Sequence, residues 1–278
     1  MKRHWHVVAH LPAFDFSGGA LKAHWTRLHA GDCEPFPTEA ALAQRIDAEN
    51  PSSSEGDIVE AVQQAWRAFH AGDFQQAFDA GSAAGLPGFV VALKAAGIYA
   101  SEVERRSHDI EELLSDASNR AKEVTELLPK DPNAHYLHAF TLGRYSQRVS
   151  IATALAEGLA GKIEKSLEAT LKLEPKHADA HIAFGVYHSE IVGKLGSIAA
   201  RLTYGASSEK AVEHFKKALK LEPHAPIVKI EYAQALQRVD ASAHADEIEK
   251  LLTDAAECEP ADAVEWLDRE RAKRLLKQ

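Results

Sequence analysis

Histidines and a cysteine are concentrated in the first 33 residues of the chain. Imidazole and thiolate suit zinc, so these residues define a candidate metal site: His4, His6, His10, His24, His29 and Cys33. Their spacing matches no metal-binding motif, and no pattern of carboxylates accompanies them. We therefore expect histidines that are solvated or ordinarily hydrogen-bonded, without a metal or any other cofactor. A metal-dependent enzyme built on this segment is the least favoured of three functional hypotheses.

Charged residues recur at one position of three related segments in the second half of the chain. Arg144, Glu190 and Arg238 each stand fifteen residues after a proline, and Arg148 and Lys194 follow the first two after four residues. Because arginine binds carboxylates through two parallel hydrogen bonds, this column suits an acidic or carboxylate-bearing ligand. Alternatively, Glu190 pairs with Arg144 and Arg238 and joins neighbouring repeats, which is the interpretation that we favour.

Tyr145 and His188 adjoin the charged column and complete the set of candidate groove-binding residues. Apolar residues around them form either the floor of a pocket or part of the core. No Ser/His/Asp or Cys/His set suggests nucleophilic catalysis. Glycines at positions 193, 196 and 205 lack the residue order of a phosphate-binding loop. We therefore expect a protein that is not an enzyme.

The charged column belongs to three similar segments that begin near Pro129, Pro175 and Pro223. Proline cannot continue a helix, so each one separates an amphipathic run from the helix that follows. A small residue stands ten positions after each proline: Ala139, Gly185 and Ala233. Small residues in mid-helix allow a neighbouring helix to approach closely, so these segments predict packed helix pairs.

The run before Pro223 has the spacing of a buried helical stripe. Ala211, Phe215 and Ala218 recur at i, i+4 and i+7, and the proline follows at i+12. This quartet resembles the second helix of a tetratricopeptide (TPR) motif. We therefore predict an all-α fold, a TPR-like right-handed superhelical α-solenoid of antiparallel helix pairs with lengthened repeats. Phe215 and Ala218 should face the core, and Gly185 should lie at a close helix approach.

Two insertions lengthen the repeats, residues 148–161 and 191–206. Each contains an apolar stripe at helical spacing, so it either lengthens the first helix of its repeat or adds a short third helix. Ser207 or Ser208 should cap the helix that follows. Residues 1–56 lack the repeat and are predicted to form an N-terminal extension with one or two short helices. Residues 57–278 are predicted to form the helical repeat domain.

The formal net charge of −9 argues against a nucleic-acid partner, because nucleic-acid-binding surfaces are basic. We expect no membrane span and no signal sequence, since no apolar stretch reaches the required length of about 18 residues. Cys33 and Cys258 lie far apart and form no redox or ligand motif. These features predict a cytoplasmic protein with free thiols.

From about Pro129 to Pro260 the chain resembles the regulator of microtubule dynamics family. It is also similar to the T component that accompanies some tripartite periplasmic (TRAP) transporters. The likeness is carried by the segments LKLEPKHADAHIAFGVYH and GSIAARLTYGASSEKAVEHFKKALKLEP. Both resemblances imply an all-α repeat architecture that binds a partner or a ligand, and neither implies a reaction.

Three functions are compatible with these features. The favoured one is a non-catalytic interaction protein that binds a peptide or protein partner in a concave groove. The second is a helical solenoid that binds a small molecule, with the two insertions closing a pocket. The third is the metal-dependent enzyme. An open polar groove favours the first hypothesis, and a deep cavity bordered by the insertions favours the second.

Overall fold

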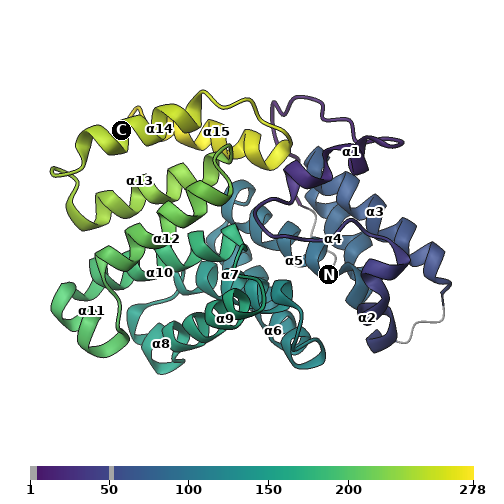
Figure 1. Ribbon diagram of the computed structural model, residues 1–278, viewed down its shortest axis with the longest axis horizontal. Helices are drawn as coiled ribbons and strands as arrows, with labels where there is room; N and C mark the ends of the chain where they lie inside the picture. The colour runs from purple at the N-terminus through teal and green to yellow at the C-terminus, as the bar shows by residue number, and fades with distance from the viewer. Residues whose placement is uncertain (1–4, 50–52) are drawn as a thin grey trace.

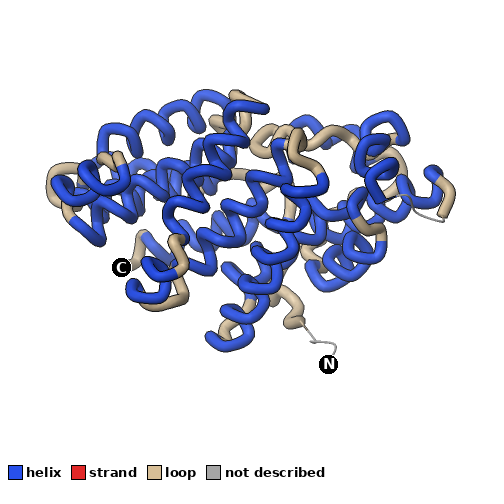
Figure 2. Tube along the Cα trace, turned by 90° about the horizontal axis from the view of Figure 1, so that it is seen from below, coloured by secondary structure: helices blue, strands red, loops and turns tan. Residues whose placement is uncertain are grey.

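The computed structural model describes residues 5–49 and 53–278, and within these ranges the chain consists of helices and loops without a β-strand (Figure 2). The prediction of an all-α protein is confirmed. The α-helices, labelled in Figure 1, are α1 (Ala20–Leu28), α2 (Glu39–Glu49), α3 (Glu55–Ala71), α4 (Phe74–Ala83), α5 (Phe89–Ile98), α6 (Ser107–Leu127), α7 (Pro132–Ser146), α8 (Ile151–Ala156), α9 (Leu159–Leu173), α10 (Ala178–Leu195), α11 (Ser197–Tyr204), α12 (Ser208–Leu221), α13 (Pro226–Asp240), α14 (Ala245–Ala256) and α15 (Ala263–Leu275). A short 3-10 helix, η1 (Leu86–Gly88), precedes α5, and a π-helical turn, η2 (Tyr99–Val103), follows it.

Side-chain caps explain where several helices begin. Asp131 accepts hydrogen bonds from two backbone N–H groups at the start of α7, and Pro132 occupies the first helical position. Ser207 accepts a hydrogen bond from the backbone N–H of Lys210 and so caps α12, which begins at Ser208. Such residues satisfy N–H groups that have no partner inside the helix. These helix starts are therefore encoded locally in the sequence.

The helices follow an arc that closes on itself. In Figure 1 the chain runs from α3 at the right through α6 and α9 to α11 at the lower left, and then over α13 and α14 back toward the right. Consecutive elements pack together: α6 on α7, α7 on α9, α10 on α12 and α13, and α13 on α14. The last helix, α15, contacts both α13 and α3. Helices from the two halves of the chain therefore surround a common interior.

The N-terminal segment is part of the main core. Leu21 of α1 and Leu42 of α2 have no exposed surface. Trp25 packs edge-on against Trp66 of α3, with 5.6 Å between ring centroids. All four side chains belong to the same hydrophobic cluster as the buried residues of α5 and α7. The boundary expected between residues 56 and 57 falls inside the first turn of α3.

Helices α10 and α12 approach closely at Gly185. A Cβ added there would lie 2.5 Å from Cε2 of Phe215, so the aromatic ring occupies the space above the glycine. Phe215 and Ala218 have no exposed surface. The predicted burial of both residues and the predicted close approach at Gly185 are confirmed. Glu213 and Lys217 lie on the opposite face of α12 as an exposed ion pair.

Each insertion contains a short additional helix, α8 in the first and α11 in the second, which is the second of the two alternatives above. Both helices carry large apolar side chains that are mainly exposed: Ile151 and Leu155 on α8, and Ile198 and Leu202 on α11. Burial in the core therefore does not explain why these four positions are apolar.

One stretch has the length and apolar composition of a membrane span, contrary to expectation. It runs from Leu86 to Val103 through η1, α5 and η2. Within the fold, 72% of this stretch is buried, and α5 packs against α4, α6 and α7. Core helices meet the same criteria of length and composition, so this feature is weak evidence for a membrane span.

Substitutions at the contact between α10 and α12 test this packing. Phe215→Ala should destabilise the protein by about 3–5 kcal/mol through lost burial and a cavity. Gly185→Ala should destabilise it by about 1–3 kcal/mol, because the new Cβ collides with the Phe215 ring. Glu213→Ala, on the exposed face, should change the free energy of unfolding by less than about 0.5 kcal/mol. Urea denaturation measures all three, and a neutral Gly185→Ala variant would contradict the described contact.

Candidate functional site

A cavity of about 410 Å³ lies in the interior that the arc of helices surrounds. Its walls come from the loop after α1, from α5, from α7 to α11, and from α13 and α15. Sites for small ligands usually measure about 300–1,000 Å³. The cavity is therefore large enough for a small molecule or for a few side chains of a bound peptide.

Helices α7 and α10 each present one face to the cavity. Their lining residues recur three or four positions apart, which places them on a single side of the helix. On α7 these include Tyr136, Phe140 and Gly143, and on α10 they include Asp179, Ile182, Val186 and Glu190. Helix α13 adds Ile227 and Glu231. These three helices are the ones that follow the repeat prolines.

Three predicted groove residues line the cavity: Arg144, Glu190 and Lys194. Nη2 of Arg144 lies 3.4 Å from Oε1 of Glu231, and Nζ of Lys194 lies 3.2 Å from Oε2 of Glu190. The expected pairing of Glu190 with Arg144 and Arg238 is therefore wrong. The buried carboxylate of Glu231 on α13 is the ion-pair partner of Arg144 across the repeats. Glu190 forms its ion pair within its own helix and accepts a hydrogen bond from Nε2 of Gln147 at 2.6 Å.

The other four predicted groove residues lie outside the cavity lining: Tyr145, Arg148, His188 and Arg238. Tyr145 is half-buried against the main core, and Arg148 is exposed. The Arg238 guanidinium is also exposed, with Nη1 3.5 Å from the hydroxyl of Ser189 on α10. Partner binding by the seven predicted residues stays a prediction, and only three of them are placed to contact a ligand inside the cavity.

His188 is buried between α10 and α12. Its ring stacks on Phe184 with 5.5 Å between centroids, and His214 stacks on the same phenylalanine at 4.7 Å. Nδ1 of His214 lies 2.9 Å from Nδ1 of His181, close enough to share one hydrogen. Burial lowers the pKa of His188 and of His214 to about 4. Both rings are therefore neutral at pH 7 and belong to the packing of this seam.

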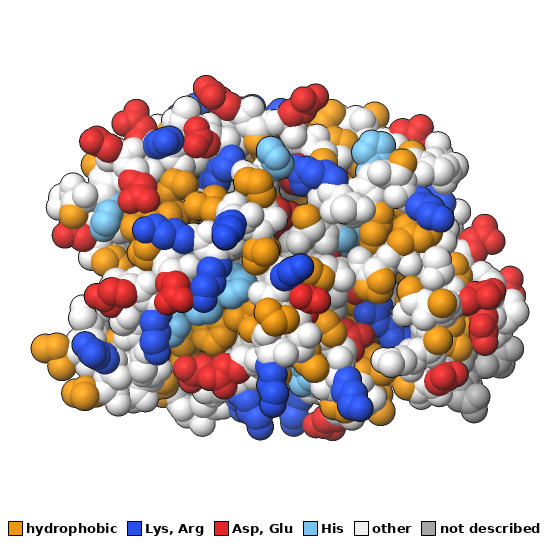
Figure 3. Space-filling model, viewed as in Figure 1, with side chains coloured by type: hydrophobic (Ala, Val, Ile, Leu, Met, Phe, Trp, Pro, Cys, Tyr) orange, Lys and Arg blue, Asp and Glu red, His pale blue; other side chains and the backbone are white. Residues whose placement is uncertain are grey.

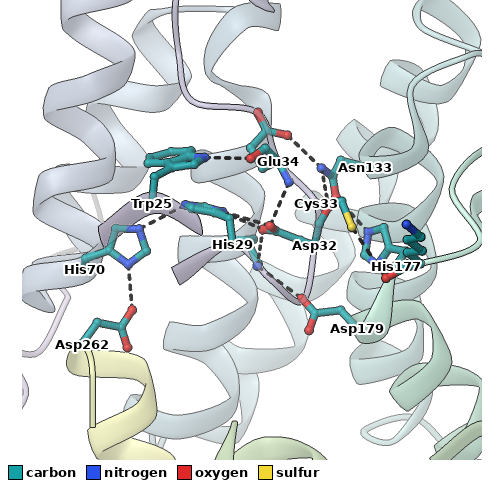
Figure 4. A network of polar contacts seen from close by, with 12 residues as sticks. Trp25, His29, Asp32, Cys33, Glu34, His70, Asn133, His177, Asp179 and Asp262 are labelled. Carbon is teal, nitrogen blue, oxygen red and sulfur yellow. Dashed lines mark hydrogen bonds and ion pairs between the residues drawn. The ribbon is translucent and has the colours of Figure 1, made fainter. Parts of the chain in front are cut away.

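A buried ion cluster forms the polar end of the cavity. It consists of Asp32 in the loop after α1, Lys94 on α5 and Asp179 on α10. Figure 4 shows the polar contacts around two of its members, Asp32 and Asp179. Nζ of Lys94 lies 2.6 Å from Oδ2 of Asp32 and 3.4 Å from Oδ2 of Asp179. Burial opposes both charges, but Asp32 raises the pKa of Lys94 well above its ordinary value. In turn His29 and Lys94 hold the pKa of Asp32 well below its ordinary value, against the effect of burial.

A chain of hydrogen bonds extends the cluster to α3 and α15. Nδ1 of His29 contacts Asp32 at 2.9 Å, and Nε2 of His29 lies 3.3 Å from Nε2 of His70. Nδ1 of His70 contacts Asp262, the N-cap of α15, at 2.7 Å. All four ring nitrogens therefore have partners within the protein. The chain therefore connects the loop after α1 with α3 and α15.

A second buried network holds the loop after α1 against α2 and α7. Arg45 binds the carboxylate of Glu34 through Nη1 at 2.6 Å and Nη2 at 3.0 Å, and its Nε contacts Asp131 at 2.9 Å. Asn133 donates a hydrogen bond to Glu34 at 2.8 Å, and the indole N–H of Trp25 donates to the Glu34 carbonyl. The loop that carries Asp32 is therefore fixed from several sides.

The histidines of the N-terminal segment are dispersed. His4 lies outside the described residues, whereas His6, His10 and His24 are exposed and His29 is buried. In the described part of the chain no group of three or more His, Cys, Asp or Glu side chains is placed to hold a metal ion.

Cys33 is held as a thiol rather than a thiolate. Cys33 is exposed as a whole, but partial burial of its thiol, followed by the charge of Glu174, raises the pKa of Cys33 to about 12. A protonated thiol is a poor metal ligand and a poor nucleophile.

The opposite end of the cavity is open and mostly apolar, with the ion pair of Glu190 and Lys194 beside it on α10. The two insertions border it, with Ile151 and Leu155 from α8, Leu195 from the end of α10 and Tyr204 from α11. Ile151 and Leu155 are 58% and 57% exposed, so they extend from the cavity wall to the surface.

The buried ion cluster was missed by the interpretation of the sequence. Its members stand 62 and 85 residues apart, so no local spacing connects them. One signal was present: Lys94 is the only charged residue of α5, an otherwise apolar and buried helix. A single charge in such a helix implies a buried partner, although it does not identify Asp32.

A double-mutant cycle tests the cluster. Asp32→Ala should destabilise the protein by about 3–5 kcal/mol, because it leaves the Lys94 ammonium without its closest partner. Adding Lys94→Met should recover part of this loss, with a coupling energy of about 1–3 kcal/mol. The exposed pair Glu213 and Lys217 serves as the matched control, with a coupling below about 1 kcal/mol. Equal couplings for the two pairs in urea denaturation would contradict the described cluster.

The histidines between α10 and α12 should make stability depend on pH. The folded-state pKa of His214, about 4, lies below its ordinary value of 6.5, so the unfolded chain binds more protons between these limits. The free energy of unfolding should therefore fall as the pH drops from 6.5 toward 4. His214→Gln should reduce this slope in urea denaturation at pH 7, 6 and 5. An equal pH dependence of the free energy of unfolding in the wild type and the variant would contradict the lowered pKa of His214.

Comparison with protein-family models gives a match for most of the chain. No curated protein matches the chain. The family model for regulator of microtubule dynamics protein 1-3 matches residues 89–278, from the start of α5 through the last residue. The match covers more than half of the chain and includes most of the helices that line the cavity. The chain belongs to the regulator of microtubule dynamics protein 1-3 family.

Proposed function

We propose that this protein is a non-catalytic interaction protein whose cavity receives an apolar segment of a partner protein. The apolar mouth of the cavity is the observation that carries the proposal. Ile151 and Leu155 are more than half exposed and Leu195 is 38% exposed, yet all three also line the cavity. Exposed apolar side chains gathered at one site are characteristic of binding surfaces. A partner segment that enters the cavity would bury them.

The arrangement of the helices supports a TPR-like right-handed solenoid. In TPR arrays the first helix of each pair lines the concave surface, and here α7, α10 and α13 line the cavity. Residues 208–221 of α12 and the residues of α14 are absent from the lining, as expected for second helices on the outer side, whereas α9 contributes Leu159 and Ile163. A partner protein also agrees with the family name, regulator of microtubule dynamics.

Several features favour binding over catalysis and over nucleic acid. His29 and His70 use all their ring nitrogens within the protein. On the face shown in Figure 3, acidic, basic and hydrophobic side chains alternate, and the net charge of −9 disfavours a polyanion. Both cysteines are free thiols, in keeping with a cytoplasmic location.

A small amphipathic molecule is the second candidate for the cavity. Both insertions border the cavity, as this hypothesis requires, and its volume of about 410 Å³ suits such a ligand. In this case the insertions would close over the ligand instead of admitting a polypeptide segment.

A charged substitution at the cavity mouth should distinguish a protein segment from a small molecule as the ligand. A photo-crosslinking residue at Ala154, a lining position on α8, would capture a partner inside cells of the native organism. The test combines this residue with Leu155→Asp at the mouth or with Leu127→Asp as control. Leu127 is 58% exposed at the end of α6 and lies outside the lining, so it matches Leu155 in exposure. Leu155→Asp should reduce the crosslinked partner at least tenfold, because a carboxylate then replaces the apolar contact.

The proposal predicts a crosslinked protein that Leu127→Asp retains and Leu155→Asp loses. Equal crosslinking of both variants would contradict binding at the mouth. Native mass spectrometry of the purified protein detects the second candidate. A retained small molecule that Leu155→Asp abolishes, without any crosslinked protein, would favour that candidate instead.

A further inference from the structure

Glu222 has an unusual environment at the polar end of the cavity. It lines the cavity at the C-terminal end of α12, its side chain is only 8% exposed, and Oε2 is buried without a hydrogen-bond partner. A buried carboxylate oxygen without a partner is unfavourable. The C-terminus of a helix also carries partial negative charge, which attracts cations and repels a carboxylate. The charge of Lys94 offsets part of this cost, but no hydrogen bond to Oε2 does so.

Asp179 places a second carboxylate beside Glu222. A Cβ added to Gly31 would lie 2.5 Å from Oδ1 of Asp179 and 2.8 Å from Oε2 of Glu222. The two oxygens therefore converge on the space next to the glycine. Asp179 directs its other oxygen to Lys94. Burial and the charge of Asp179 raise the pKa of Glu222 well above its ordinary value. This response is expected of two neighbouring acidic groups whose nearby cation, Lys94, is already paired with Asp32.

The cavity walls offer no spare positive charge. Among the described lining residues, carboxyl groups outnumber lysines and arginines by nine to three. All three basic side chains already form ion pairs: Lys94 with Asp32, Arg144 with Glu231, and Lys194 with Glu190. An anionic ligand would therefore find no free cation in the lining. A cationic ligand would find the unpartnered oxygen of Glu222.

We infer that the polar end of the cavity binds a cationic amine, whose charge lies next to Glu222 and Asp179 near Gly31. The apolar part of the same ligand fills the remainder of the cavity toward α8. This inference rests on the proposed function and specifies its ligand: a segment with a basic side chain among apolar ones. A free amphipathic amine has the same chemistry, and the experiment distinguishes the two sources.

Calorimetric titration with three probes of equal chain length tests the charge preference. Octylamine is cationic at pH 7.5, 1-octanol is neutral and octanoate is anionic. The wild type should bind octylamine at least tenfold more tightly than octanol, and octanoate more weakly still. Glu222→Gln should abolish the preference for the amine while keeping the affinity for octanol. Glu213→Gln, the same substitution at an exposed position of α12, should behave as the wild type.

Gly31→Ala provides a second variant, because its methyl group would occupy the space between the two carboxylates. It should also remove the amine preference, and thermal melts would show that each variant is folded. Absence of octylamine binding to the wild type would overturn the inference. An amine preference that both folded variants retain would overturn it as well.

Two peptides distinguish the sources of the amine. One is a seven-residue apolar peptide with a central lysine, and the other carries norleucine in its place. Tighter binding of the lysine peptide supports a protein partner with a basic side chain. Equal binding of both peptides, together with no preference for octylamine, would overturn the cation site and leave the proposed function standing. A preference for octylamine without binding of either peptide would support the cation site and contradict a protein segment as ligand.

Discussion

The buried carboxylate of Asp32 is the feature on which the arrangement of this protein depends. A charge without solvent is strongly unfavourable unless hydrogen bonds and an opposite charge compensate for it. Lys94 provides the opposite charge, and His29 donates from the other side. These groups come from the loop after α1 and from α5, while Asp179 and Asp262 connect them to α10 and α15 (Figure 4). Segments from both halves of the chain must therefore be in place together.

The ion cluster around Asp32 makes one end of the cavity polar, so the two ends of the cavity differ in polarity. Near Asp32 the walls carry charged groups held in fixed positions by the two buried networks. Toward α8 and α11 the walls are mostly apolar and the side chains reach solvent. A ligand with one polar and one apolar part matches this gradient, because each part would find a compatible environment. The insertions lengthen the repeats and also build the apolar end, so they contribute to the binding surface.

Helical periodicity in the sequence predicts which side chains pack in the core. It does not predict polar contacts between residues far apart in the chain. The spacing of Ala211, Phe215 and Ala218 identified a buried stripe, because helical periodicity alone determines which face a residue occupies. The choice of Glu190 as partner of Arg144 was wrong, since sequence position in a repeat does not specify which acidic side chain on a facing helix lies nearest. Glu231 lies closer to Arg144 and is buried between Arg144 and Arg271 of α15, whose Nη1 is 3.2 Å from Oε1 of Glu231. Similarly, Asp32 and Lys94 share no periodicity that would connect them.

Hydrogen exchange measured by mass spectrometry tests directly whether Asp32 holds these segments together. The comparison is between the wild type and Asp32→Asn, which removes the charge and keeps the shape. Exchange should be faster in residues 29–34 and in the first turns of α10 and α15, because local opening there no longer breaks the ion cluster. Helices α12 and α14, which lie outside the cluster, should exchange as in the wild type. Unchanged exchange in residues 29–34 and in the first turns of α10 and α15 would contradict the central role of Asp32.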